Sequence, residues 1–277
     1  MIQARARRPA RERLDVLLHR RGLARSRSAA QALVMSGRVE VEGRRVDKAG
    51  TPCASDARIT VLQTGRNWVS RGGAKLSGAL DALNIDPAAM TVLDVGASTG
   101  GFTDCLLQRG AARVVALDVG HGQIDWSLRG DPRVDVIEGV NARHLEPGML
   151  PAACLPFDLV VIDVSFISLR LILPPIARLV NADASVLPLV KPQFEAGPAQ
   201  VGRGGIVQEA ATRRGVICAV AQHARDAGFA VLGAVPSMLR GAEGNREYFL
   251  HLAPGTGGWS PEECEKHAEA ITVQETD

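Results

Sequence analysis

The sequence predicts an α/β protein in which a doubly wound, Rossmann-like sheet follows a small α+β domain. From residue 70 onward, strand and helix signals alternate, a pattern typical of a mostly parallel sheet with helices on both faces. The preceding stretch instead carries two helix patterns followed by short strand patterns. We therefore expect four parts in chain order: a small domain at 1–62, a linker at 63–69, the α/β domain at 70–253 and a tail at 254–277.

The balance of basic and acidic residues changes close to the predicted boundary between the two domains. Residues 1–75 contain 17 Lys and Arg against 6 Asp and Glu, whereas residues 76–277 contain 15 against 24. A basic module on an acidic body is typical of proteins that bind a polyanion through one part of the chain. A solvated basic face without a partner is the alternative that charge counting leaves open.

The small domain begins with leucines at helical spacing, which predict a helix over Glu12–Arg21 with Gly22 as its stop. A serine cap predicts a second helix from Ser26 or Ser28 to Ser36. Short strands complete the domain, and we expect them at Val39–Val41, Arg44–Val46 and Arg58–Leu62.

Arginines gather along the second helix and before it, and we take five as candidate contacts to a phosphate backbone: Arg20, Arg21, Arg25, Arg27 and Arg38. The stretch LARSRSAA, followed by GRVEVEG, resembles the RNA-binding domain named after ribosomal protein S4. Glu42 stands where many relatives have Asn. The resemblance implies structured RNA as the ligand and no particular chemistry.

In the α/β domain, an amphipathic helix over Ala74–Leu83 precedes the alternating pattern. The expected strands are Val92–Val95, Val114–Asp118, Val134–Ile137, Phe157–Asp163 and Ser185–Val190, then an antiparallel pair at Phe229–Val235 and Glu247–Leu252. The expected helices between them are Gly101–Gln108, Gln123–Leu128, Ser168–Val180 and Val207–Asp226. The polar residues after Ala253 carry no clear pattern.

A Gly-rich loop, LDVGASTGGF, follows the first of these strands. Its candidate cofactor-binding residues are Asp94, Gly96, Ala97, Ser98, Thr99, Gly100 and Phe102. Glycines there let a ligand approach the backbone, and the point where a parallel sheet reverses its strand order is the usual ligand crevice. The spacing is not the GxGxxG of dinucleotide folds, because Ser98 stands where the second Gly would be.

Asp118 ends the second strand, 22 residues after Gly96, where a carboxylate can accept hydrogen bonds from ribose hydroxyls. Asn141 follows the third strand, at the position expected to face adenine. Together with the loop, these residues fit S-adenosylmethionine better than NAD. A plain tight turn with an exposed Asp is the structural alternative.

Lysine is rare, with 4 Lys against 28 Arg. An amine can shift its pKa and take part in proton transfer, whereas a guanidinium effectively cannot. Lys191 and Asp163 lie at the carboxyl ends of strands, Lys75 opens the helix before the first strand, and Glu247 starts the last strand. Two lysines and two carboxylates can thus converge beside the Gly-rich loop; ordinary surface charges are the other interpretation.

Seven motifs occur in order: WVSRGGAKL, LDVGASTGGFTD, ALDVGHGQIDWSLR, NARHL, IDVSFISL, LVKPQFE and GNREYF. With them, nearly the whole chain closely resembles the TlyA (hemolysin A) family of ribosomal RNA methyltransferases. The catalytic domain of that family is similar to the FtsJ-like ribose 2′-O-methyltransferases. The resemblance implies S-adenosylmethionine as cofactor and a cytidine in 16S and 23S rRNA, within ribosomal subunits or their assembly states, as target.

The family's Lys-Asp-Lys-Glu tetrad falls on Lys75, Asp163, Lys191 and Glu247. Its interdomain tetrapeptide falls on Arg66, Asn67, Trp68 and Val69, and we expect Trp68 to couple RNA docking to cofactor binding. We expect Lys191 to accept or orient the proton of the ribose hydroxyl, with Lys75 lowering its pKa and the two carboxylates steering the amine. Four aromatic residues are candidates for stacking on a base, although such residues are more often core: Trp68, Trp126, Phe102 and Phe166.

Three other classes fit the sequence less well. A nicotinamide oxidoreductase would carry GxGxxG, a non-catalytic RNA-binding assembly factor would not need the tetrad, and a membrane-active toxin would need an apolar or strongly amphipathic segment. No apolar run approaches the roughly 20 residues that span a bilayer, and the Arg-rich start lacks the apolar core of a secretory signal. The five scattered cysteines form no CxxC pair, so we expect a reducing, cytoplasmic setting without a metal site.

Overall fold

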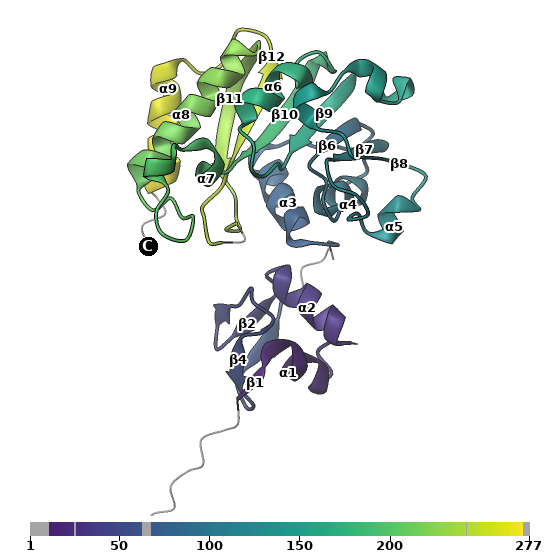
Figure 1. Cartoon of the computed structure of the whole chain (residues 1–277), viewed down its shortest axis with the longest axis vertical. Helices are drawn as coiled ribbons and strands as arrows, with labels where there is room; N and C mark the ends of the chain where they lie inside the picture. The colour runs from purple at the N-terminus through teal and green to yellow at the C-terminus, as the bar shows by residue number, and fades with distance from the viewer. Residues whose placement is uncertain (1–10, 25, 63–67, 242, 274–277) are drawn as a thin grey trace, which may run out of the picture. The chain divides into compact units, whose positions relative to one another are not determined.

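The computed structural model describes residues 11–24, 26–62, 68–241 and 243–273 (Figure 1). Its contacts divide the chain into two units, Met1–Arg71 and Gly72–Asp277. The first is a small α+β unit and the second holds the large sheet.

In the first unit, two helices accompany two small antiparallel sheets, β1-β4 and β3-β2-β5. The elements are β1 (Arg11–Arg13), α1 (Leu14–Arg20), α2 (Arg27–Met35), β2 (Val39–Val41), β3 (Arg44–Arg45), β4 (Pro52–Ala54) and β5 (Ile59–Val61). Both predicted helices and the three predicted strands are present. The predicted start of the first helix at Glu12 is wrong, because residues 11–13 pair with β4 as a strand. That strand partner has little signal of its own, so local periodicity could not reveal the pairing.

The core of this unit comes from the leucines that predicted the first helix. Leu14, Leu17 and Leu18 are fully buried and pack with Val34 of α2 and Val39 of β2. Ser26 caps α2 as expected, accepting a hydrogen bond from the Ala29 N–H at 3.1 Å.

The second unit is a seven-stranded sheet in the order β11-β12-β10-β9-β6-β7-β8. The strands are β6 (Thr91–Val95), β7 (Arg113–Asp118), β8 (Val134–Glu138), β9 (Phe157–Ile162), β10 (Val180–Val190), β11 (Phe229–Pro236) and β12 (Tyr248–Pro254). The first five run parallel, and β12 is antiparallel to both β10 and β11. The predicted parallel sheet and its final antiparallel pair are therefore confirmed.

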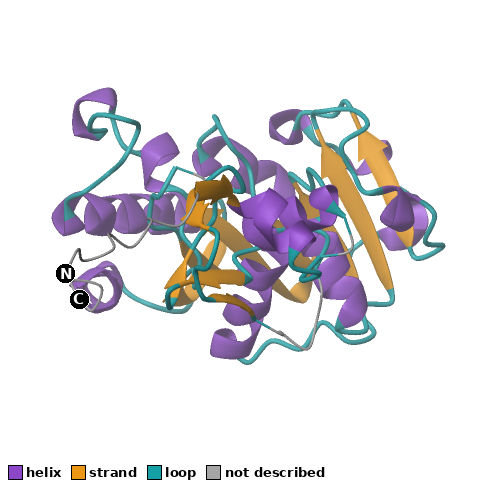
Figure 2. Ribbon diagram, turned by 90° about the horizontal axis from the view of Figure 1, so that it is seen from below, coloured by secondary structure: helices purple, strands orange, loops and turns teal. Residues whose placement is uncertain are grey.

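Helices lie against both faces of this sheet (Figure 2). They are α3 (Arg71–Leu83), α4 (Gly101–Gln108), α5 (Trp126–Arg129), α6 (Leu169–Ile176), α7 (Pro192–Glu195), α8 (Ala210–Asp226) and α9 (Pro261–Val273). Short 3₁₀ helices are η1 (Ala142–His144), η2 (Pro147–Met149), η3 (Ala152–Cys154) and η4 (Pro198–Gln200). The core on one face joins alternate residues of the strands to α6 and α8.

Several boundaries differ from the prediction. The helix expected over Ser168–Val180 is wrong at its end: α6 stops at Ile176, directly after a Pro-Pro pair, and Val180 already pairs with Phe157 of β9. Proline removes a backbone donor and disturbs the preceding turn, so the early stop follows from the sequence. The helices α7 and α9 were not predicted from the sequence, since α7 is a single turn and α9 lies in the polar tail.

Strand order places a topological switch point between β6 and β9, because the chain proceeds from β6 towards β8 and then returns to the other side of β6. In sheets of this kind the crevice outside the carboxyl ends of the strands at this point is the usual ligand site.

Candidate active site

Four predicted residues lie along one edge of the sheet. Gly96 follows β6, Asp163 follows β9, Lys191 follows β10 and Glu247 precedes β12, in the same order as the strands. Val190 of β10 pairs with Tyr248 of the antiparallel strand β12, so Lys191 and Glu247 stand opposite each other just beyond that pair. The tetrad candidates are therefore gathered at the carboxyl edge where the Gly-rich loop also lies.

The tetrad forms two ion pairs with different exposure. Lys191 Nζ lies 2.6 Å from Asp163 Oδ1 and donates to Ser165 Oγ at 2.9 Å. The Lys75 ammonium from α3 pairs with the Glu247 carboxylate, and both of these side chains are buried. The first pair keeps part of its surface open to solvent, with 11% of Lys191 and 22% of Asp163 exposed, so it is the pair a substrate can reach.

A cavity of about 730 Å³ opens at the switch point. Its lining includes four predicted cofactor-binding residues, Gly96, Ser98, Asp118 and Asn141, and the predicted catalytic residue Asp163. Volumes of this size are ordinary for small-molecule sites. The cavity therefore joins the Gly-rich loop to Asp163, and Lys191, which pairs with Asp163, is not among the lining residues. The other predicted cofactor residues lie outside its lining: Asp94, Ala97, Thr99, Gly100 and Phe102.

Asp118 organises the loop that faces the cavity. Its carboxylate accepts hydrogen bonds from the Ser98 N–H at 2.8 Å and the Gly120 N–H at 2.7 Å. Ser98 has φ +49°, a left-handed conformation that its bond to Asp118 helps to hold. Each carboxylate oxygen keeps a further lone pair, so Asp118 can still accept hydrogen bonds from a ligand.

The glycines of the loop are required by internal packing. A Cβ on Gly96 (φ +84°) would lie 2.4 Å from the backbone oxygen of Asp163. A Cβ on Gly100 (φ +92°) would lie 2.2 Å from a methyl group of Leu128. Sequence reasoning ascribed these glycines to the close approach of a ligand. In the structure they let β6, β9 and α5 approach one another, and this packing shapes the cavity.

Asp94 and Phe102 support the loop from inside the fold. The Asp94 carboxyl is completely buried and accepts a hydrogen bond from Thr103 Oγ1 of α4 at 2.6 Å. Burial raises the pKa of Asp94 to about 7. Phe102 is also buried, with its ring centroid 6.0 Å from that of Phe249. Both residues tie α4 to the sheet and so fix the position of the loop between them.

The segment between β9 and α6 contributes more to the cavity than the sequence indicated. Ser165, Phe166 and Ser168 line it. Phe166 is 90% exposed, has φ +63°, and lies with its ring centroid 4.9 Å from that of Phe194. Of the candidate stacking residues, Phe166 lines the cavity, whereas the 82% exposed Trp126 does not. The available signal was an aromatic residue flanked by serines directly after a buried strand.

In the first unit, the described candidate arginines all have partners within that unit. Arg20 pairs with Glu12, Arg21 donates to two backbone oxygens at 2.6 Å each, and Arg38 donates to the Leu62 oxygen. Arg27 pairs with Asp15 at 3.3 Å. The fifth candidate, Arg25, lies outside the described residues. These arginines therefore shape the basic unit as well as giving it charge.

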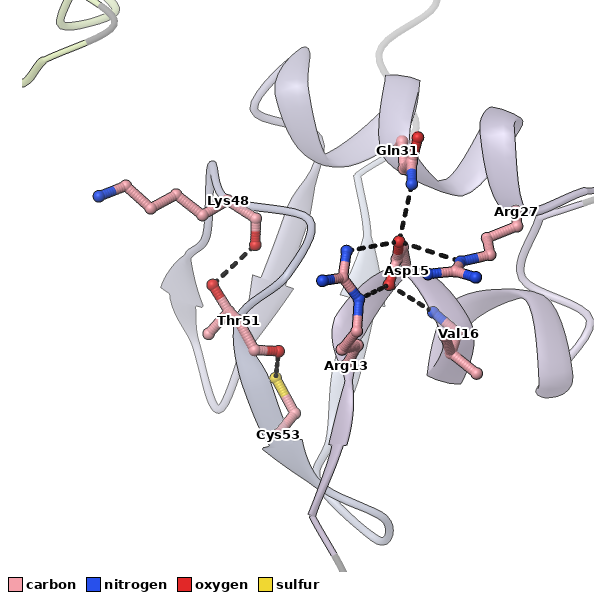
Figure 3. Close-up of polar contacts among 8 residues, drawn as sticks. All are labelled: Arg13, Asp15, Val16, Arg27, Gln31, Lys48, Thr51 and Cys53. Carbon is pink, nitrogen blue, oxygen red and sulfur yellow. Dashed lines mark hydrogen bonds and ion pairs between the residues drawn. The ribbon is translucent and has the colours of Figure 1, made fainter.

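Asp15 is the centre of this network (Figure 3). Its fully buried carboxylate accepts hydrogen bonds from both Arg13 and Arg27, from Gln31 at 2.8 Å and from the Val16 N–H at 3.0 Å. The hydrogen bonds from Arg13 hold the pKa of Asp15 well below its usual range. Asp15 thus fixes the N-terminal strand and α2 around α1.

Sequence reasoning did not single out the arginines of the hairpin β2-β3. Arg44 and Arg45 are both exposed, and no side-chain partner of either is found among the described residues. The signal for them was two consecutive arginines directly after the Glu42-Gly43 turn. Of the predicted linker tetrapeptide, Arg66 and Asn67 lie outside the described residues, and Trp68 and Val69 directly precede α3.

A doubly wound sheet with a cavity at its switch point, an acidic end to its second strand and a lysine–carboxylate pair at the same edge defines a Rossmann-like enzyme domain. The FtsJ-like methyltransferase family model matches residues 68–254, and the S4 domain model matches residues 12–59. The chain therefore belongs to the FtsJ-like methyltransferase family and carries an S4 domain before it. The predicted combination of an S4-like domain with an FtsJ-like methyltransferase domain is confirmed.

Individual relatives agree with this assignment. The chain is 49% identical to the 16S/23S rRNA (cytidine-2′-O)-methyltransferase TlyA of Mycobacterium tuberculosis, over 89% of this chain and 91% of that protein. It is 40% identical to Hemolysin A of Brachyspira hyodysenteriae, over 87% and 99% respectively. A solved structure from Streptococcus thermophilus that carries the hemolysin name matches with a TM-score of 0.74 and 40% identity, over 96% of this chain and 97% of that one.

The described part of the chain shows neither a membrane-spanning helix nor a metal-binding cluster. None of its helices is both long and apolar enough to cross a bilayer. Within the same residues, no cluster of three or more His, Cys, Asp or Glu side chains could hold a metal ion.

Proposed function

We propose that this protein transfers a methyl group from S-adenosylmethionine to the ribose 2′-hydroxyl of a cytidine in 16S rRNA, 23S rRNA or both, acting on ribosomal subunits in the cytoplasm. The observation that carries the proposal is the cavity that joins Asp118 and the Gly-rich loop to Asp163, whose carboxylate pairs with Lys191. The relative at 49% identity, whose name specifies this reaction, supports the same conclusion.

The residues present fit S-adenosylmethionine. Asp118 retains lone pairs that can accept hydrogen bonds from two ribose hydroxyls, and Asn141 lines the cavity after β8, where an adenine would lie. Gly96 and Ser98, which follow β6, line the same cavity. When bound, S-adenosylmethionine supplies an electrophilic methyl group. The loop residues bind and orient it, and the cavity places it next to Asp163.

Lys191 is the residue that acts on the RNA hydroxyl in this proposal. Its terminal nitrogen is held by Asp163 Oδ1 and Ser165 Oγ, whose residues line the cavity, and these contacts fix its direction. Lys191 can accept the hydroxyl proton only as a neutral amine, so in this proposal the ammonium group that pairs with Asp163 first releases a proton to water. The amine then takes the proton of the ribose hydroxyl as the methyl group leaves sulfur for the ribose oxygen, and Asp163 stabilises the ammonium ion that forms. Alignment of the two reacting groups supplies a further part of the rate acceleration.

The target nucleotide needs a surface to hold it beside Lys191. Phe166 presents an exposed ring at the cavity, and an aromatic face of this kind can stack on an unpaired base. The S4 unit supplies the basic surface that holds the surrounding RNA.

The test is methyl transfer from labelled S-adenosylmethionine to purified small and large ribosomal subunits. We expect incorporation by the wild-type protein, a loss of about 10²- to 10⁴-fold in kcat for Lys191→Ala, and unchanged turnover for Lys266→Ala. Lys266 is a matched control because it is an exposed lysine on α9. Near-normal turnover by Lys191→Ala would refute the role of that lysine. Absence of incorporation by the wild type, with RNA binding intact, would favour a non-catalytic ribosome assembly factor.

A further inference from the structure

The short segment 191–195 contacts the loop 163–169 at three successive points. Lys191 forms an ion pair with Asp163 and donates a hydrogen bond to Ser165, and the Phe194 ring packs on Phe166. Glu195 makes the third contact, at the point where the loop enters α6. One turn of helix thus follows the whole length of the loop that lines the cavity.

Glu195 closes this set of contacts with two hydrogen bonds. Its Oε2 accepts from Ser168 Oγ at 2.7 Å, and its Oε1 accepts from the Leu169 N–H at 2.8 Å. A helix usually has its first N–H groups capped by the residue that precedes it. Here a carboxylate 27 residues downstream of Ser168 supplies part of the cap, and the positive end of the α6 dipole favours its charge.

The loop between these anchors contains a strained backbone position. Phe166 has φ +63°, a conformation that side chains other than glycine rarely adopt. The Asp163 N–H is fixed by the Val95 oxygen at 2.8 Å, so the loop is attached to β6 at its start. Glu195 attaches its end, and the residues between the two attachments include Ser165 and Phe166.

We propose that Glu195 is a positioning residue of the active site, which holds the end of loop 163–169 so that Asp163 stays on Lys191 and Phe166 stays at the cavity. This inference rests on the proposed function. Glu195 touches neither the cavity nor the proposed substrate, since it acts through Ser168 and Leu169. Burial raises the pKa of its carboxyl, which is consistent with its enclosed position against the start of α6.

The experiment compares Glu195→Ala, Glu195→Gln and Glu263→Ala in the full-length protein. Glu263 is a matched control because it also caps a helix: its carboxylate accepts from the Ser260 N–H at 2.8 Å, and Ser260 Oγ accepts from the Glu263 N–H at 3.2 Å, at the start of α9. The measurements are S-adenosylmethionine affinity by calorimetry, KM and kcat for methyl transfer, and the melting temperature.

For Glu195→Ala we expect S-adenosylmethionine to bind roughly tenfold more weakly and kcat at saturation to fall at least about tenfold, because small displacements of a positioning element reduce rates strongly. Glu195→Gln retains an acceptor for the Leu169 N–H and a group that can bond to Ser168, so it should stay within about threefold of the wild type. Glu263→Ala should lower the melting temperature, because a helix cap is lost, and leave KM and kcat unchanged.

A Glu195→Ala protein with wild-type KM and kcat but a lower melting temperature would overturn the proposal, because Glu195 would then be only a helix cap. Equal losses of affinity and kcat in the Ala and Gln variants would also overturn it. The charge of Glu195, rather than its hydrogen bonds to Ser168 and Leu169, would then be the property that matters. Should Glu195→Ala fail to fold, Ser168→Ala removes one of the two bonds and carries the same comparison. Failure of the wild type to methylate any rRNA would refute the proposed function alone, because calorimetry with S-adenosylmethionine still tests the role of Glu195.

Discussion

Lys75 and Glu247, which lie 172 residues apart in the chain, form an ion pair that is almost closed to solvent. Only 6% of the Lys75 side chain and 3% of the Glu247 side chain are exposed. Gly241 packs directly against the carboxylate, where a Cβ would lie 2.4 Å from Glu247 Oε1. The pair therefore joins α3 to the residue that precedes β12, the last strand of the sheet in chain order.

Breaking this pair on one side leaves a buried charge without a partner. We expect Lys75→Met and Glu247→Leu each to lower the free energy of unfolding by about 3–5 kcal/mol, and the double variant to recover most of that loss. Urea unfolding measures the three values. The exposed pair Arg214–Glu269 is the control, and Arg214→Ala should cost about 0–1 kcal/mol. Single variants that cost no more than this control would contradict the prediction.

The buried carboxyl of Asp94 should make stability fall as pH rises. Its pKa is about 7 in the folded protein against 3.8 ordinarily, so the folded state holds a proton that the unfolded state has released. The free energy of unfolding should therefore decrease between about pH 4 and pH 7, by up to about 4 kcal/mol, and change little from this source above pH 7. In Asp94→Asn this contribution is absent. Urea unfolding at pH 5 and pH 8 measures the difference, and equal pH dependence in the two proteins would disprove it.

Asp15 should produce the opposite dependence in the S4 unit. Its pKa is lowered by Arg13, so the stability it contributes is fully present above about pH 4 and is lost as the pH falls towards the folded pKa. Asp15→Asn should lower the opening free energy of α1 and α2 by about 2–3 kcal/mol, measured by hydrogen exchange in the full-length protein. Glu12→Gln, which affects the more exposed Arg20 pair, should change it by less than about 1 kcal/mol. Comparable effects of the two variants would count against this role.

Arg44 and Arg45 should contact RNA phosphates directly. Replacing both by Ala should reduce the slope of log K against log salt by about 1–2 for binding to ribosomal RNA, without altering hydrogen exchange in α1 and α2. Arg27→Ala, in contrast, should weaken binding and also increase exchange, because Arg27 is bonded to Asp15. Filter binding over a salt series measures the slopes. An unchanged slope for the double variant would exclude the hairpin from the RNA contact.

The sequence by itself determined most of the architecture, since apolar periodicity reports which residues can be buried on a strand or helix. It also indicated the S4 domain, the methyltransferase domain and the residues at the carboxyl edge of the sheet. The helix α9 has a local signal, the capping box of Ser260 and Glu263, that the periodicity of the tail did not reveal. The sequence could not indicate that residues 11–13 form a strand or that the strand after α6 begins at Val180. Each of these depends on a partner distant in the chain, whose contribution local periodicity does not contain.

Only the tertiary structure shows how the four charged side chains of the tetrad pair and which of them are exposed. The two lysines and two carboxylates could be named from the sequence, but which pair is closed and which is partly open to solvent depends on how α3 meets the start of β12 and how β9 lies beside β10. The same holds for Glu195, whose partners Ser168 and Leu169 lie in another segment. Side-chain identity fixes what a group can donate or accept, whereas its partner and its exposure to water are properties of the packed fold.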